Sequence, residues 1–152
     1  MERGKLAERN FKDGCNCTQA VLLAFSDRTG LDAETAMRIA SGFGGGMARM
    51  REVCGAVSGM FMAAGLILGD DGVPSHEHKR ALYAQLQALA AQFRAENGSL
   101  LCRELLSGTR TAPGGVPEER TEQYYRKRPC AELCRCAAEL LEQYLQATEK
   151  RE

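Results

Sequence analysis

The chain has 152 residues, of which 44% are hydrophobic and 26% charged, and these values indicate one globular domain with a single core. Twenty Lys and Arg balance twenty Asp and Glu, which argues against a nucleic-acid-binding face. The charged N-terminus has no apolar signal-peptide core, and the apolar run at residues 54–69 is too short to span a bilayer. We therefore expect a cytoplasmic protein that binds neither nucleic acid nor membrane.

Helical periodicity, capping residues and glycine or proline breaks predict an all-α bundle of about six to eight helices in one domain covering residues 1–152. No segment alternates apolar and polar residues over the length of a strand. A buried helix of small residues at 54–68 is expected to lie at the centre. The expected helices, in chain order, cover residues 2–12, 17–29, 33–40, 54–68, 76–97, 102–106, 117–125 and 129–146, with a loop at 107–117.

A glycine-rich turn, Gly42-Phe43-Gly44-Gly45-Gly46, follows the third expected helix. It lacks the third glycine of a dinucleotide fingerprint and the Gly-Lys-Ser/Thr of a P-loop, so a nucleotide site is not indicated. A sharp turn accounts for one or two glycines through positive φ. Four glycines within five residues favour close approach of the backbone to a bound group, with Gly44, Gly45 and Gly46 as cofactor-binding candidates.

Cys54 begins the central helix and is followed by Gly55, Ala56 and, one turn later, Gly59. The helix dipole and unpaired N–H groups at this position are expected to lower the pKa of the Cys54 thiol. Gly55 and Gly59 leave N–H groups accessible to a thiolate or sulfide. The same small residues also allow another helix to pack closely, and both interpretations can hold.

Seven cysteines occur, and no Cys-x-x-Cys pair is among them, which disfavours thioredoxin-like, zinc-ribbon and ferredoxin sites built from local pairs. Any shared site must therefore be assembled from distant segments. Cys17, Cys54, Cys102 and Cys130 each lie at or near an expected helix start, where negative charge is favoured. The alternative is that several are small buried hydrophobic residues. The weaker candidates are Cys15, Cys134 and Cys136.

Four segments, "GCNCTQAVLLAF", "SGFGGGMARMREVCGAVSGM", "CRELL" and "CAELCRCAAELLEQYL", resemble the C_GCAxxG_C_C family of redox-active proteins. Residues 54–59 match the Cys-Gly-Ala-x-x-Gly signature. The resemblance implies that Cys17, Cys54, Cys102 and Cys130 are the four family cysteines. A similar cysteine-bearing helical region occurs in split-Soret cytochromes, which are associated with an iron–sulfur centre, but the haem motif Cys-x-x-Cys-His is missing here.

We expect a small redox protein in which these four cysteines converge on an iron–sulfur cluster and transfer electrons to an unidentified redox partner, as an electron carrier or oxidoreductase. One alternative is thiol–disulfide chemistry, with Cys54 as the low-pKa nucleophile and a second catalytic thiol such as Cys17. Another is a helical module with structural zinc, or with no metal. The oligomeric state is left open, with a homodimer as one alternative.

Overall fold

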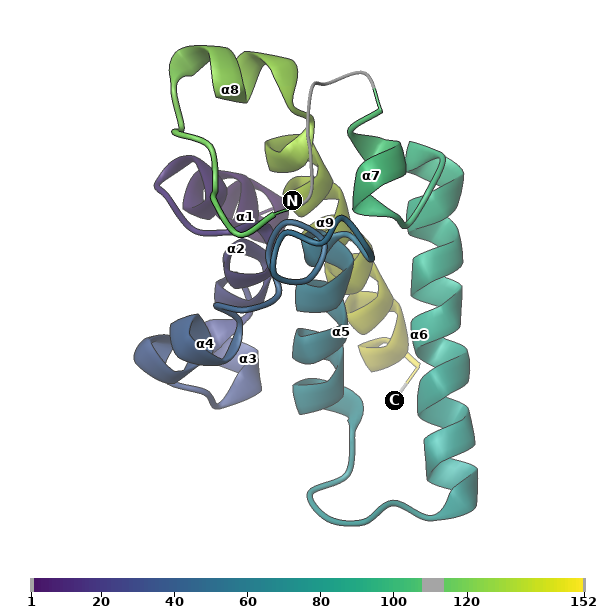
Figure 1. The fold of residues 1–152 in the computed structure, drawn as a ribbon. Helices are drawn as coiled ribbons and strands as arrows, with labels where there is room; N and C mark the ends of the chain where they lie inside the picture. Colours follow the sequence, from purple (N-terminus) through teal and green to yellow (C-terminus); the bar gives the residue numbers. More distant parts are fainter. Residues whose placement is uncertain (1, 108–113, 152) are drawn as a thin grey trace.

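The computed structural model describes residues 2–107 and 114–151 (Figure 1). Its described residues form an all-α fold, as predicted, with nine helices where six to eight were expected. No strand occurs in these ranges, and the one β-bridge there joins Val53 and Leu101. The helices are α1 (Glu2–Lys12), α2 (Cys17–Leu23), α3 (Ser26–Thr29), α4 (Ala33–Ile39), α5 (Gly55–Leu68), α6 (His76–Asn97), α7 (Cys102–Leu105), α8 (Glu122–Lys127) and α9 (Cys130–Glu149).

Side-chain caps begin the helices where the sequence indicated them. Asp32 accepts a hydrogen bond from the backbone N–H of Thr35 at the start of α4, and Ser75 accepts one from His78 at the start of α6. Each cap satisfies a backbone donor that has no partner inside the helix. Gly98, in the left-handed region at φ 92°, ends α6, as glycine often does.

Two expected helices differ from the structure. The predicted helix at 17–29 is interrupted, because Phe25 leaves helical geometry at φ −114° and ψ 20° and places its ring in the core, fully buried. The predicted start at Pro117 was wrong. Thr121 caps α8 instead, so residues 117–121 precede the helix as non-helical backbone. Residues 108–113 of the predicted loop lie outside the described residues.

The central helix α5 packs against α2, α3, α6 and α9 (Figure 1). Helix α5 packs closely on α2 because Gly59 has no side chain. A Cβ at Gly59 would lie 2.6 Å from the backbone oxygen of Thr18 and 3.0 Å from Cβ of Val21. The small residues of this helix therefore form a helix contact at Gly59, and those predicted to share one stripe, Gly55, Gly59, Ala63 and Ala64, are all buried.

The long helices α6 and α9 cover the other side of α5. On α6, Leu89, Ala90 and Phe93 are buried, whereas Leu82 and Leu86 are only partly buried. On α9, buried residues occur along most of the helix: Leu133, Cys134, Ala137, Ala138, Leu140, Leu141 and Leu145. Both helices are therefore amphipathic elements packed on one core.

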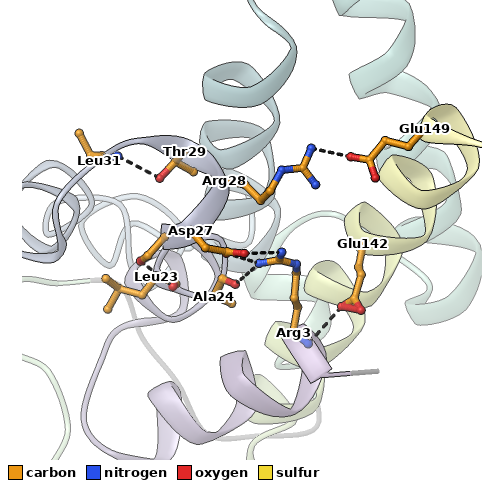
Figure 2. Close-up of polar contacts among 10 residues, drawn as sticks. Arg3, Leu23, Ala24, Asp27, Arg28, Thr29, Leu31, Glu142 and Glu149 are labelled. Carbon is orange, nitrogen blue, oxygen red and sulfur yellow. Dashed lines mark hydrogen bonds and ion pairs between the residues drawn. The ribbon is translucent and has the colours of Figure 1, made fainter. Parts of the chain in front are cut away.

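Polar contacts join α1, α3 and α9 at one edge of the bundle (Figure 2). The Arg3 guanidinium donates to both carboxylate oxygens of Asp27, at 2.6 and 2.9 Å, and to the backbone oxygen of Ala24. The backbone N–H of Arg3 donates to Glu142, and Arg28 pairs with Glu149 at 2.6 Å. These charged groups pair with one another across the three helices.

None of the described helices combines the length and apolar character needed to cross a membrane.

Candidate functional site

The four predicted cysteines all lie at helix starts. Cys17, Cys102 and Cys130 are the first residues of α2, α7 and α9, and Cys54 occupies the N-cap of α5. Local sequence produces these positions through Asn16, Pro129 and the glycines that follow Cys54. In Figure 1 the starts of α5 and α9 lie at the same end of the bundle as α7 and α8.

All four cysteines line one cavity of about 60 Å³, which we call the cysteine cavity. Cys54 and Cys102 are buried, and Cys17 and Cys130 are partly buried. Apolar walls come from Phe11, Leu105, Leu106, Leu133 and the ring of Tyr124. Across residues 2–107 and 114–151, no three Cys, His, Asp or Glu side chains are close enough together to hold a single metal ion. The four thiols therefore line the cavity without surrounding a single ion-sized position.

The segment after the glycine-rich turn brings Cys54 beside Cys102. The backbone N–H of Cys102 donates to Glu52 at 2.6 Å, and that of Cys54 donates to Leu100 at 2.8 Å. These two bonds flank the isolated bridge between Val53 and Leu101. A short backbone pairing thus joins two cysteines that are far apart in sequence.

The glycine-rich turn has an unusual backbone. Gly45 and Gly46 adopt φ of 67° and 74°, and the next residues, Met47, Ala48 and Arg49, are also left-handed. Backbone hydrogen bonds within the turn hold this path, including the one from the Glu52 N–H to the Gly46 oxygen at 2.8 Å. Left-handed non-glycine residues are costly and persist where the surrounding structure imposes them. The strained path places the turn against the thiols.

The glycines predicted to bind a cofactor have different neighbours. The Gly45 N–H acts to lower the pKa of Cys17. A Cβ at Gly46 would lie 2.6 Å from Cβ of Cys102, and a Cβ at Gly55 would collide with Sγ of Cys17. Gly44 packs instead on the side chain of Asn16, and Gly59 packs on α2 without lining the cavity. Only glycines 45, 46 and 55 of this set therefore meet a thiol or its Cβ.

The expected low pKa of Cys54 is wrong for this structure. Burial, followed by the nearby Cys17, raises the pKa of Cys54 well above its usual range, although the N–H groups of Ala56 and Val57 oppose the shift. Burial likewise raises the pKa of Cys17 and that of Cys130, the latter to about 12. The cost of placing a thiolate in an apolar site exceeds the helix-start contribution. Burial therefore favours the neutral thiol at Cys17, Cys54 and Cys130.

Sequence reasoning missed three arginines that line the same cavity, Arg51, Arg120 and Arg128. Arg51 is only 4% exposed, and its Nη1 lies 3.6 Å from Sγ of Cys102. Arg128 and Arg51 both act to lower the pKa of Cys130. No periodicity in the sequence separates these arginines from the other basic residues, because all three lie in loops outside the helices.

The remaining cysteines lie outside the cavity lining. Cys134 is fully buried, and its thiol donates to the backbone oxygen of Cys17 at 3.7 Å. Cys136 donates to Glu96 at 3.0 Å, and Cys15 lies 3.9 Å from the sulfur of Met37. All seven cysteines are free thiols. Cys134 therefore contacts the backbone of Cys17, whereas Cys15 and Cys136 contact residues that do not line the cavity.

Comparisons with curated proteins and with solved structures give no significant match. A family model described as "Putative redox-active protein (C_GCAxxG_C_C)" matches residues 15–144. This range holds the four cavity cysteines and the glycines that contact them, and it covers most of the chain. The chain therefore belongs to the C_GCAxxG_C_C family of redox-active proteins.

Proposed function

We propose that this protein is a small electron-transfer protein in which Cys17, Cys54, Cys102 and Cys130 bind an iron–sulfur cluster. The observation that carries the proposal is the shared cavity, lined by these four thiols from four different helix starts. Four cysteine thiolates are the usual ligand set of such clusters. When bound, the cluster would supply reversible one-electron chemistry.

The cavity size favours a group of several atoms. At about 60 Å³, it has several times the ~10–15 Å³ that one water molecule needs. A structural zinc ion has bonds of ~2.3 Å to four sulfurs that close around it, and it needs no such space. The zinc alternative is therefore less well supported than a cluster.

The surrounding charges suit an anionic group. A cluster with four thiolates needs nearby positive charge or N–H donors when it is buried. Nη1 of Arg51 lies 3.6 Å from the Cys102 sulfur, and the N–H groups of Gly45 and Ala56 act to lower the pKa of Cys17 and of Cys54. These groups would stabilise thiolates once metal displaces the thiol protons.

The thiol–disulfide alternative is less well supported at Cys54. Nucleophilic cysteines need thiolate character and access to solvent. Cys54 is 5% exposed, and burial raises its pKa.

Other residues of the cavity would also serve a redox role. Phe11, Leu106 and Leu133 exclude water from the thiols, and the helix starts orient the thiols.

The test is iron, sulfide and zinc content per chain after anaerobic purification and reconstitution, with a visible spectrum. We expect iron and sulfide in the wild type and a large loss in each single Cys→Ser variant at positions 17, 54, 102 and 130. Cys136→Ser is the matched control and should retain the cluster. Wild-type protein that stays colourless and metal-free after reconstitution would overturn the proposal, and stoichiometric zinc would favour the zinc module.

A further inference from the structure

A second hollow, the arginine groove, lies beside the cysteine cavity and opens to solvent. It measures about 480 Å³, and its basic wall consists of Arg49, Arg51, Arg120 and Arg128. Six residues line both hollows, so the two share a wall: Asn16, Gly45, Arg51, Arg120, Tyr124 and Arg128. Any molecule in the groove would therefore lie across this shared wall from the cysteine cavity.

The groove has an excess of positive charge. Its four guanidinium groups face one carboxylate, that of Glu118. Oε1 of Glu118 lies 2.5 Å from Arg49, 3.0 Å from Arg128 and 3.8 Å from Arg51. The side chains of Arg51 and Arg128 are only 5% and 6% exposed. Buried guanidinium groups need anionic partners, and one carboxylate shared by three arginines supplies too few.

Arg51 has donors without acceptors. Its Nε and Nη2 atoms are buried and make no hydrogen bond within the described part of the chain. Nη2 lies on the Glu118 side, beyond hydrogen-bonding distance, whereas Nη1 faces the Cys102 sulfur. The planar guanidinium donates in pairs to carboxylate or phosphate oxygens. One edge of Arg51 is therefore buried without an acceptor, next to the Glu118 carboxylate.

Aromatic contacts hold two other arginines in place. The guanidinium of Arg128 lies 4.6 Å from the centre of the Tyr124 ring, and that of Arg120 lies 5.7 Å from the same ring and 4.3 Å from the ring of Phe11. Arg120 also donates to the backbone oxygen of Phe11 at 2.7 Å. Fixed donors lose little entropy when a ligand binds.

We propose that the arginine groove is a binding site for a small oxyanion, a molecule bearing a carboxylate or phosphate group, and that Glu118 is its built-in competitor. Arg49 and Arg128 already bind one such group, the carboxylate of Glu118. An oxyanion that displaces the Glu118 carboxylate would supply the missing acceptor to Arg51 and add negative charge at the solvent side of the cysteine cavity. This goes beyond electron transfer, because it places an anionic ligand beside the redox centre.

The experiment is calorimetric titration of purified protein with sodium phosphate and with sodium succinate, against sodium chloride at matched ionic strength. We expect saturable binding of at least one oxyanion and none of chloride. Glu118→Gln should bind about tenfold more tightly, because a competing carboxylate is removed, and Arg51→Gln about tenfold more weakly. Arg80→Gln, which changes an exposed arginine on α6, is the matched control. The tighter-binding oxyanion identifies the headgroup.

Equal responses to chloride and oxyanions, or wild-type affinity in Arg51→Gln, would overturn the proposal. If Arg51→Gln does not fold, the wild-type protein still decides through its arginine ¹⁵Nε signals, since phosphate or succinate must shift that of Arg51. Iron and sulfide assays on the same samples separate the two proposals. A cluster without oxyanion binding overturns the groove alone, and oxyanion binding without a cluster overturns the redox proposal alone.

Discussion

Gly55 and Cys17 lie so close together that a single methyl group at position 55 would collide with the sulfur of Cys17. The contact joins the first residue of α5 to the first residue of α2. Thr18 strengthens the same junction, since its buried hydroxyl donates to the Gly55 oxygen at 2.9 Å. The second glycine-specific position of the family signature, Gly59, meets the backbone of α2 one turn later.

Gly55→Ala should displace the Cys17 thiol and lower both metal content and stability. Overfilling a packed contact costs ~1–3 kcal/mol of unfolding free energy. Gly65→Ala is the control in the same helix, because a Cβ there meets nothing within 4 Å, and it should be stabilising by ~0.5–1 kcal/mol. Chemical denaturation with parallel iron analysis checks both. Equal iron content and stability in the Gly55 variant and wild type would contradict the close contact.

Gly59→Leu should destabilise the protein by ~1–3 kcal/mol or more, because the new side chain must displace α2. A Cβ at this position would lie 2.6 Å from the Thr18 backbone oxygen, and a backbone atom cannot move aside as a flexible side chain can. The melting temperature is the measurement. An unchanged value would show that α2 and α5 do not pack closely at Gly59.

Asn16→Ala should weaken the start of α2. Asn16 forms a capping box with Gln19, and its Nδ2 donates to the backbone oxygens of Ala40 and Ser41 at 3.2 and 3.3 Å. Loss of the cap alone costs ~0.5–2 kcal/mol. Asn16→Asp keeps the cap acceptor but loses the two amide donors, so its unfolding free energy should fall less. If the aspartate variant is as unstable as the alanine variant, the cap is not the main contribution.

Glu96→Gln should make Cys136 more reactive toward iodoacetamide. Burial first, and then the hydrogen bond to Glu96, raise the pKa of Cys136 to about 11, so removing the carboxylate lowers that pKa and increases the thiolate fraction. Glu132→Gln, an exposed position on α9, is the control. Mass spectrometry after timed alkylation gives the rates, and identical rates in the two variants would contradict the role of Glu96.

The same shift predicts a pH dependence of stability. The folded-state pKa of Cys136 is about 11, against an ordinary 9.0, so the unfolded chain releases this proton at lower pH. The thiol's contribution to stability is therefore full below pH 9.0 and is lost as the pH rises toward 11. The difference in unfolding free energy between wild type and Cys136→Ala should shrink over this range, whereas a constant difference would exclude the linkage.

Local sequence was sufficient for most of the helices and for the position of cysteines along them. Asp32, Ser75 and Gly98 act within one turn of their own residue, and such short-range signals can be read without tertiary structure. Phe25 could not be predicted in this way. Its burial in the core interrupts a segment whose helical spacing is regular, because tertiary packing overrides local preference.

The sequence by itself determined an all-α chain whose four family cysteines stand at helix starts, since capping and periodicity depend on neighbouring residues. Only the tertiary structure decided that Cys17, Cys54, Cys102 and Cys130 line one cavity, that Arg51 and Arg128 share it, and that Glu118 faces both arginines. It also reversed the expected pKa of Cys54. Burial and electrostatic fields are sums over residues distant in the chain, so the charge state of a thiol is a property of the fold.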